Sequence, residues 1–445
     1  MKVKFLNLIA FNSLLVVSLY IFMFIIYPEN SNYFQCNILT TNTSKSFDLT
    51  YLIPVSCDLE VYMIGVNDFS SIIEFDYNYQ TRPLYILFVK FFHIVLSRFI
   101  ENTLILEFLT FLILHLFIVT ISIYIFFKSF FKKFRKNHAS LIYLISGFII
   151  LNPIIRYGLF DSAHQTLTLL TFVLCLLFLR KQNLSSTELF SYSILIGLLS
   201  LANVSIILSA IFLLYNKVKN INLIKNNFLK IALSIFLITS PKMLWNLYIF
   251  SNGFTPYNAA TQYWYQFIWL KDFILVNYQN VDYNLNEGAY YCMSVPLFIK
   301  CYLLDFFKTI IYLLLPIITI IFNFYILKKK NIQIIFDFLK NLLFIVILLF
   351  SFWAFIGWYP PLRFNLYSLG YFVTITLCIQ FIYLPYKEKT LPSFIFLFIY
   401  YLSLPHWNNL DILNVNVGLI GSYLLFIVYV YKTYKENKTD VSSSL

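Results

Sequence analysis

The chain has 445 residues, of which 60% are hydrophobic and only 12% are charged, and its formal net charge is +12 at pH 7. Soluble domains carry about 25% charged residues, so this composition excludes an ordinary soluble globular protein and indicates a membrane protein. The distribution of the positive charge argues against a nucleic-acid-binding surface. The basic residues gather in short loops between apolar runs, as the positive-inside rule describes for cytoplasmic loops. These basic loops are 128–136, 180–181, 217–230, 328–330, 387–389 and 432–438.

The first apolar run, from Phe5 to Tyr27, follows Lys2 and Lys4. It is longer than the apolar region of a signal peptide and has no small-x-small cleavage site at its end, so we expect a retained first helix. The N-terminus then lies in the cytoplasm, and the chain enters a long outer loop. The protein is therefore expected in the cytoplasmic membrane, which it crosses many times.

The next apolar run, 83–99, is expected to lie on the outer surface of the membrane. If it crossed, the Lys-rich loop 128–136 would face outward, against the charge rule. The sequence therefore predicts an amphipathic, partly embedded helix with Lys90 and Arg98 toward water. With this helix included, the first outer loop comprises residues 28–102.

A run at 189–215 has basic flanks on both sides, which should both be cytoplasmic. We predict two short helices that meet at a tight turn near Asn203, neither of them reaching fully across. The helix at 231–250 then runs outward into a second outer loop, 251–305. The other predicted membrane helices are 103–127, 141–156, 165–179, 306–327, 341–357, 364–383, 391–404 and 415–434.

These elements predict an all-α polytopic protein with about twelve transmembrane helices in a single domain, 1–445, and a cytoplasmic C-terminus. Four cysteines lie in or beside the outer loops, where pairing within each loop and free thiols both stay open. They are Cys36 and Cys57 in the first loop and Cys292 and Cys301 in the second. Cys175 and Cys378 lie within helices and are expected to be packing residues, and no Cys/His spacing resembles a metal site.

Ionisable residues at the outer rim of a membrane protein are candidates for function, because burying them is costly. The first loop carries Asp58, Glu60 and Tyr62, and ends in Arg82-Pro-Leu-Tyr85. If 58–69 is helical, Asp58 and Tyr62 lie on one face at a spacing of four residues.

Further candidates follow the later helices. Asn152-Pro153 and Arg156 end one helix, and Asp161 and His164 precede the next; helix capping is an equal reading of Asp161. Lys242 lies below the outer end of its helix, where snorkelling to the surface would also explain it. Arg82, Arg156, Lys242 and Arg363 could together hold a phosphate or pyrophosphate, with interfacial anchoring as the competing explanation for each.

In their order along the chain these landmarks resemble those of bacterial membrane glycosyltransferases of the GT-C fold, which use polyprenyl-phosphate sugars. The resemblance covers roughly residues 1–385, with Trp245 where the family usually has Arg and Phe364 where it has Tyr. The segments that carry it are Asp58–Tyr62, Arg82-Pro-Leu-Tyr85, Asn152-Pro153, Asp161, Pro241, Asn246, Gly253, Pro256 and Arg363-Phe364.

The resemblance implies an inverting transfer of sugar from a polyprenyl-phosphate donor, beside membrane lipid, to a glycan, lipid or protein acceptor outside the cytoplasm. It implies Asp58 as general base, with Glu60 as the alternative, and Arg363 with Lys242 or Arg82 at the departing phosphate. Asp161 would bind a divalent cation or orient the acceptor. The other substrate-binding candidates are Tyr85, Arg156 and His164.

Three alternatives stay open. A polysaccharide polymerase or another lipid-linked glycan enzyme would share the composition, although the second outer loop lacks the arginines expected of a polymerase. A transporter or flippase would need more cavity-lining charge and more broken helices than this Gly-poor chain has, since Glu107 and His115 are the main polar groups of 103–127. A non-catalytic assembly component is the third.

Overall fold

The computed structural model describes residues 5–26, 59–74, 78–130, 166–181, 184–218 and 221–257, the helix 423–432, and shorter stretches within 142–159 and 314–352. Within these residues the regular structure is helical and contains no strand, which confirms the predicted all-α class for the described part. The chain divides into a first unit, residues 1–143 and 155–261, and a second unit, residues 144–154 and 262–445. Each unit is described by itself.

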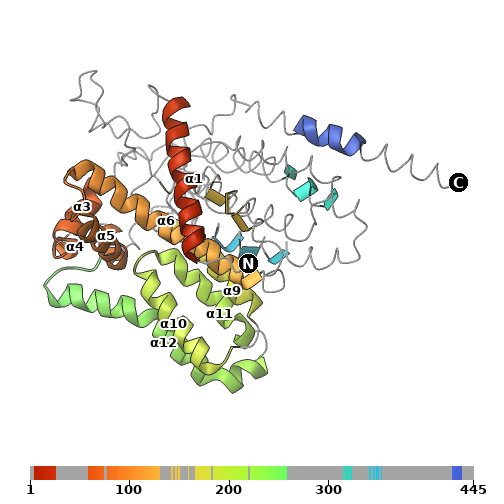
Figure 1. Cartoon of the computed structure of the whole chain (residues 1–445). Coiled ribbons are helices and arrows are strands. Elements are labelled where there is room, and N and C mark those ends of the chain that lie inside the picture. The colour runs from red at the N-terminus through yellow and green to blue at the C-terminus, as the bar shows by residue number, and fades with distance from the viewer. Residues whose placement is uncertain are drawn as a thin grey trace, which may run out of the picture. The chain divides into compact units, whose positions relative to one another are not determined.

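Two long helices of the first unit match the predicted positions. Helix α1 (Phe5–Ile26) packs against α6 (Thr103–Phe130), as Figure 1 shows. The Asn12 side-chain amide donates a hydrogen bond of 3.0 Å to the Thr120 hydroxyl, and both side chains are buried. Hydrogen bonds of this kind between apolar helices help to fix their register.

Short helices occupy the part of the first outer loop that precedes the predicted surface helix. They are α3 (Leu59–Asn67), α4 (Ser71–Glu74) and the 3-10 helix η2 (Asn78–Thr81). Gly65 allows the close approach of α3 to its neighbours, because a Cβ there would lie 3.0 Å from Ile72 and 3.3 Å from Ile86.

Helix α5 (Pro83–Leu96) is the predicted surface helix, and its 14 residues give a length of about 21 Å, less than the roughly 30 Å of a bilayer core. One face is buried against α3 and α6. The opposite face is exposed and apolar: Leu87, Phe91, Ile94 and Val95. Lys90 is half-buried at its edge and Arg98 is exposed beyond its end, so the outward face is more apolar than the sequence predicted.

The predicted pair of short helices at 189–215 is confirmed. Helix α9 (Thr166–Arg180) leads to α10 (Ser186–Ser200), which is followed by the 3-10 helix η3 (Val204–Ile207) and α11 (Leu208–Val218). Asn203 caps η3 by accepting a hydrogen bond of 2.9 Å from the Ser205 amide, so the break between α10 and α11 lies at the expected position.

Helix α12 (Ile221–Ser251) is ten residues longer at its start than the predicted 231–250. The basic segment 217–230 was expected as a loop, and most of it is helical. Residues 221–230 contain no Gly or Pro, and Leu and Lys favour helices. Hydropathy therefore located the start of the apolar part of this helix, whereas the helix itself begins earlier.

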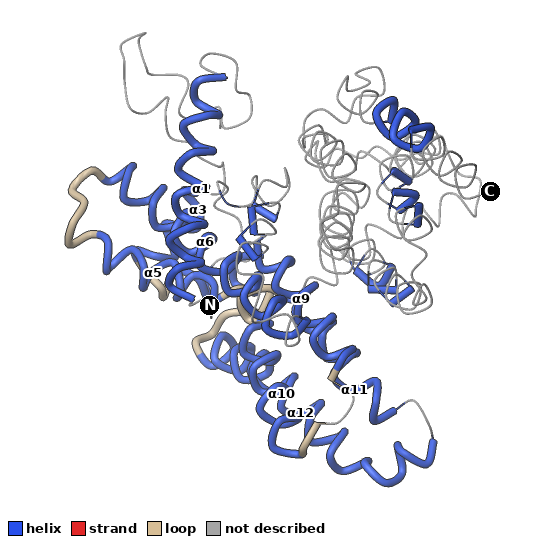
Figure 2. The backbone as a smooth tube through the Cα atoms, turned by 45° about the vertical axis from the view of Figure 1, so that its right-hand side comes forward, coloured by secondary structure: helices blue, strands red, loops and turns tan. Residues whose placement is uncertain are grey.

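Helix α12 packs mainly against α10, and Figure 2 shows α10, α11 and α12 together in one part of the first unit. At the contact, a Cβ on Gly197 would lie 2.7 Å from the carbonyl oxygens of Leu237 and Ile238 and 3.0 Å from Pro241. Pro241 has no amide hydrogen, so the Leu237 carbonyl lacks its usual helical partner. Only glycine permits α10 to approach the α12 backbone so closely at this point.

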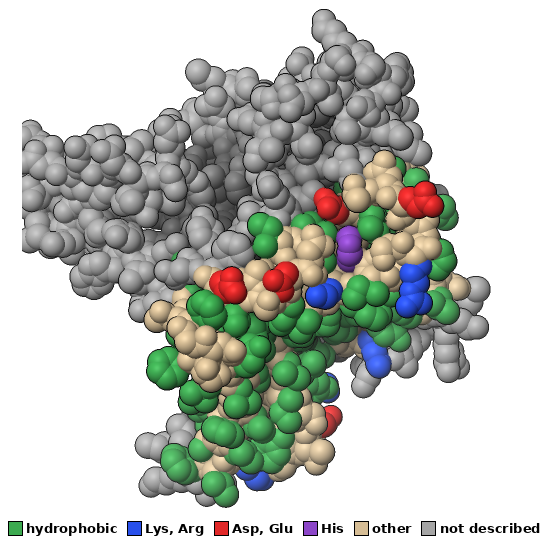
Figure 3. Space-filling view, turned by 90° about the vertical axis from the view of Figure 1, so that its left-hand side faces the viewer, with side chains coloured by type: hydrophobic (Ala, Val, Ile, Leu, Met, Phe, Trp, Pro, Cys, Tyr) green, Lys and Arg blue, Asp and Glu red, His purple; other side chains and the backbone are tan. Residues whose placement is uncertain are grey.

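Two helical segments of the described residues are long and apolar enough to cross a membrane, judged by length and composition. They are Ile105–Ser129 in α6 and Asn227–Ser251 in α12, each of 25 residues. On the face in Figure 3, hydrophobic side chains form a broad area, with most charged side chains above it and a few below. This supports membrane association, while the count of about twelve crossings stays a prediction.

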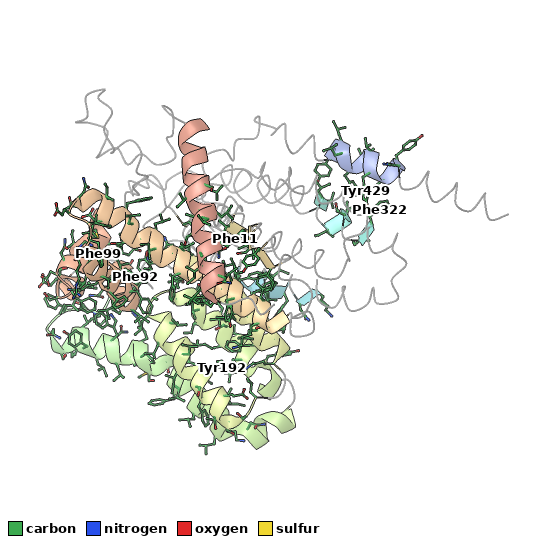
Figure 4. The ribbon with its side chains drawn as sticks, in the orientation of Figure 1. Phe11, Phe92, Phe99, Tyr192, Phe322 and Tyr429 are labelled. Atoms are coloured by element: carbon green, nitrogen blue, oxygen red, sulfur yellow. The ribbon has the colours of Figure 1, made fainter. Side chains whose placement is uncertain are left out.

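The described parts of the second unit are helical stretches. Phe322 makes edge-to-face contacts with Phe426 and Tyr429, with ring centroids 6.0 and 5.7 Å apart (Figure 4). These residues fall in two of the predicted helices, 306–327 and 415–434. The predicted helices 364–383 and 391–404, and most of the second outer loop, lie outside the described residues.

Candidate functional site

Arg82 and Tyr62, from two of the segments that carry the family resemblance, are in direct contact. The Arg82 guanidinium Nη1 donates a hydrogen bond of 2.9 Å to the Tyr62 hydroxyl. Arg82 immediately precedes α5, whose first residue is Pro83, and proline favours this first helical position because its missing amide hydrogen is not needed there. The start of α5 therefore sets the position of the guanidinium beside α3.

Beneath this pair lies a buried group of aromatic and polar side chains. The rings of Tyr62 and Tyr85 meet edge to face at 5.2 Å, and Tyr62 also contacts Phe111 at 6.2 Å. The Tyr85 hydroxyl is 2.9 Å from Nε2 of His115, and both of these side chains are fully buried. Tyr85 thereby joins α5 to α6, and this group fixes the position of Tyr62, the hydrogen-bond partner of Arg82.

A single glutamine connects the residues before Arg82 to the end of α12. Gln80 is 2% exposed, and its side-chain amide donates to the carbonyls of Ile73, at 3.0 Å, and Thr255, at 3.4 Å. Its side-chain oxygen accepts from the Tyr257 amide, and its backbone carbonyl accepts from the Trp245 indole at 2.7 Å. The first outer loop is thus joined to the beginning of the second.

Two further contacts hold the segment 80–85. The Trp245 ring stacks on Tyr248 at 5.5 Å and also contacts Phe69, at 6.2 Å, in the turn between α3 and α4. The Leu84 amide donates a hydrogen bond of 3.2 Å to the carbonyl of Leu201, in the turn after α10. The three segments of the resemblance that the structure describes therefore meet around residues 80–85.

Lys242 lies on α12, three residues before Trp245, so it is about one helical turn from the contact with Gln80. Its side chain is half-buried. Within the described part of the chain, neither Lys242 nor Arg82 forms an ion pair with a carboxylate, since the ion pair found there joins Lys181 and Glu188. Among the described residues, therefore, no carboxylate neutralises either cation, and both are available to bind an anion.

Glu107 is a carboxylate near this site that sequence reasoning did not select. It lies four residues before Phe111 and eight before His115, so the three share one face of α6, the face against Tyr62 and Tyr85. Its side chain is half-buried. In the predicted helix 103–127, the spacing of Glu107 from Phe111 and His115 by four and eight residues could have indicated this shared face.

Asp68 is the carboxylate of the exposed turn between α3 and α4. It accepts hydrogen bonds from the Ser70 hydroxyl at 2.6 Å and from the Ser70 amide at 3.0 Å. These bonds, with a smaller contribution from Lys90, hold the pKa of Asp68 below its ordinary value, because they stabilise the charged form. Asp68 is therefore ionised at neutral pH and serves the turn.

The remaining candidates cannot be placed around Arg82. Asp58, Arg156, Asp161, His164 and Arg363 lie outside the described residues; Glu60 is in α3, and its side chain is also outside them. Of the cysteines, Cys175 is a buried free thiol in α9, as expected of a packing residue, and the other five lie outside the described part.

The described residues contain no group of three or more His, Cys, Asp or Glu side chains that could hold a metal ion. Comparison with protein-family models, with curated proteins and with solved structures finds no match for this chain. A functional assignment therefore rests on the residues themselves.

Proposed function

We propose that this chain is a membrane glycosyltransferase that moves a sugar from a polyprenyl-phosphate donor to an acceptor at the outer face of the cytoplasmic membrane. The observation that carries the proposal is the meeting of three segments around residues 80–85. Tyr62 of the first segment and Arg82-Pro-Leu-Tyr85 of the second are joined by a hydrogen bond and a ring contact, and Gln80 accepts from Trp245, which lies within the third segment, 241–256, at a position where the family usually has Arg. They are separated by as many as 183 residues in the sequence, 62 to 245.

The charge of this site suits a phosphate ligand. Arg82 uses one guanidinium N–H on the Tyr62 hydroxyl, a neutral acceptor, so its charge is not cancelled by that contact. A guanidinium in partly buried surroundings binds phosphate through several parallel hydrogen bonds. Lys242 would add a second positive charge about one helical turn from the Gln80 contact, and Arg363 a third if the fold brings it here.

In the proposed reaction the acceptor hydroxyl attacks the anomeric carbon of the donor sugar. The bond from that carbon to the phosphate oxygen breaks, the phosphate leaves with the electron pair, and the hydroxyl proton passes to a carboxylate base. Asp58 is the base that the resemblance implies, and Glu107, on the face of α6 that packs against Tyr62 and Tyr85, is a second candidate. Arg82 and Lys242 would stabilise the charge on the departing polyprenyl phosphate. No step of the proposal uses a metal ion.

The test is transfer from a radiolabelled polyprenyl-phosphate sugar in membranes that contain equal amounts of wild type or variant. We expect Arg82→Gln and Asp58→Asn to lose at least about tenfold of the transfer rate, because each removes a charge used in the transition state. Arg98→Gln is the matched control: Arg98 is an exposed arginine 16 residues later, beyond the end of α5, and it should transfer like wild type.

Two results would overturn the proposal. The first is the absence of transfer from every donor sugar tested with the wild-type protein. The second is wild-type transfer by Arg82→Gln, which would remove the site around residues 80–85 from the reaction. If Asp58→Asn keeps its activity and Glu107→Gln loses it, the base is Glu107 and the rest of the proposal stands.

A further inference from the structure

Gln80 is a heavily bonded polar residue two positions before Arg82. Its side chain is buried and makes three hydrogen bonds, to Ile73, Thr255 and Tyr257, while its backbone carbonyl takes the Trp245 indole N–H. These partners belong to two regions far apart in the sequence, α4 and the end of α12 with the residues after it.

Buried polar groups that are fully hydrogen-bonded fix a local conformation, because breaking one bond leaves a buried donor or acceptor without a partner. Gln80 is itself buried and bonds to four groups at once, of which the Ile73 carbonyl is buried and those of Thr255, Tyr257 and Trp245 are less so. Only Thr81 separates it from Arg82, so any change in the backbone at residue 80 reaches the guanidinium through two peptide bonds. On the other side of Arg82, the Leu84 amide is fixed by the Leu201 carbonyl.

We infer that Gln80 is a positioning residue that couples the segment 254–257 to Arg82, so that the beginning of the second outer loop sets the affinity of the site for the phosphate of the donor. The inference rests on the proposed function for its donor. The coupling itself is a property of the described residues and is measured without any substrate.

Two variants separate the side-chain bonds from the backbone bond. Gln80→Met keeps the length of the side chain and removes its three hydrogen bonds, yet leaves the backbone carbonyl for Trp245. Trp245→Phe keeps an aromatic ring beside Phe69 and removes the indole N–H that Gln80 accepts. Asn12→Leu is the matched control, since it also removes a buried side-chain hydrogen bond, between α1 and α6, away from this segment.

The first measurement is hydrogen–deuterium exchange of the purified full-length protein, followed in peptides that cover 81–86 and 254–257. Gln80→Met should speed exchange in both peptides. The Tyr257 amide loses its acceptor, and the backbone before residues 81–86 is no longer held by the side-chain bonds of Gln80. Asn12→Leu should leave both peptides as in wild type. Faster exchange in 254–257 alone would overturn the coupling, and unchanged exchange in both would overturn any role of Gln80.

The second measurement is transfer activity at varied donor concentration. Gln80→Met should raise the KM for the donor by about tenfold, with a smaller change in kcat, because the guanidinium is displaced rather than removed. A wild-type KM together with fast exchange would overturn the link to donor affinity. If wild type itself transfers no sugar, the proposed function fails, and the exchange result alone decides whether Gln80 couples the two segments.

Discussion

At the scale of single residues, the position of the Arg82 guanidinium depends on neutral partners. Tyr62 accepts its hydrogen bond, and Tyr62 is itself held by the rings of Tyr85 and Phe111. A neutral acceptor orients the cation and leaves its charge for a ligand, whereas a carboxylate would cancel much of that charge. This arrangement favours binding of an anion over a purely structural ion pair.

Tyr62→Phe tests this orientation. The variant keeps the edge-to-face packing with Tyr85 and removes the hydroxyl that accepts from Arg82, so the melting temperature should change little. The KM for a polyprenyl-phosphate donor should rise about three- to tenfold, as expected for the loss of one hydrogen bond to a charged group. Kinetics of transfer and thermal unfolding in detergent measure the two effects. A large loss of stability with an unchanged KM would contradict the prediction.

Tyr85→Phe should act on stability. The Tyr85 hydroxyl pairs with Nε2 of His115, and both residues are fully buried. Removing the hydroxyl takes from His115 this buried partner, which costs about 1–3 kcal/mol of the free energy of unfolding. Denaturation of Tyr85→Phe, His115→Phe and the double variant measures the coupling: the double variant should lose less than the sum of the single losses. Strict additivity would show that the two side chains do not depend on each other.

The sequence could identify some of these residues and not others. Tyr62, Arg82 and Tyr85 stand out because they flank predicted helices in a loop rich in acids, and they prove to be in contact. Gln80 offers no such signal, since an uncharged residue in a loop has no periodicity and three of its partners lie 165–177 residues later. Contacts of this range arise only when the helices are placed in space.

At the scale of the elements, α10 and α12 depend on glycine where they cross. Gly197→Ala places a methyl group against two backbone carbonyls, at 2.7 Å, and these cannot move without shifting α12. We expect a loss of roughly 1–3 kcal/mol or a fall in the yield of folded protein. Gly65→Ala is the comparison, because its nearest neighbour is the side chain of Ile72 at 3.0 Å, which can adjust. Equal stability of Gly197→Ala and wild type would contradict this view of the crossing.

The connection from α9 to α10 is built from a capping box. The Ser185 side chain accepts from the Glu188 amide at 3.2 Å, and Glu188 accepts from the Ser185 amide at 3.1 Å. Lys181 lies 3.7 Å from the Glu188 carboxylate and donates a hydrogen bond of 2.6 Å to the hydroxyl of Tyr192, which is labelled in Figure 4. These contacts fix the angle at which the chain enters α10.

The capping box predicts a pH dependence. The hydrogen bonds from Ser185, and to a lesser degree the charge of Lys181, hold the pKa of Glu188 below its usual value of 4.5. A lowered folded-state pKa means that this stabilisation is fully present above pH 4.5 and is lost as the pH falls through the lower folded-state value. Ser185→Ala should reduce the stability at pH 7 and flatten its decline in acid. Melting temperatures from pH 7 to 3 measure this, and parallel curves for the two proteins would contradict it.

The short helices at 189–215 could be predicted because charge parity excluded a single span there, and Asn203 is a residue that caps helices well. The start of α12 could not be predicted in the same way. Lysine and asparagine in 221–230 signal the end of an apolar segment, but they do not end a helix, so hydropathy placed the boundary ten residues too late. Element type was therefore predictable where charge and capping agree, and element ends were not.

At the scale of the whole molecule, many of the described charged side chains of the first unit fall into two groups along the chain. Six of them lie between α3 and α6: Asp68, Glu74, Arg82, Lys90, Arg98 and Glu101. A second group comprises Lys128 in the last turn of α6, Lys181 and Glu188 at the connection from α9 to α10, and Lys230, the tenth residue of α12. The first group holds both signs and the second is mostly basic, which agrees with the positive-inside rule for a cytoplasmic second group.

Cysteine labelling tests this orientation across the membrane. In a variant whose six cysteines are replaced, single cysteines at Ser70 and Asn252 should react with a membrane-impermeant maleimide added to intact cells, because both residues are exposed and lie in the two predicted outer loops. A cysteine at Thr187, an exposed residue in the first turn of α10, should react only after the cells are opened. Labelling of Thr187→Cys in intact cells, with protection of Ser70→Cys, would invert the topology. It would place residues 80–85 on the cytoplasmic side, where a polyprenyl-phosphate donor used outside the membrane could not reach Arg82.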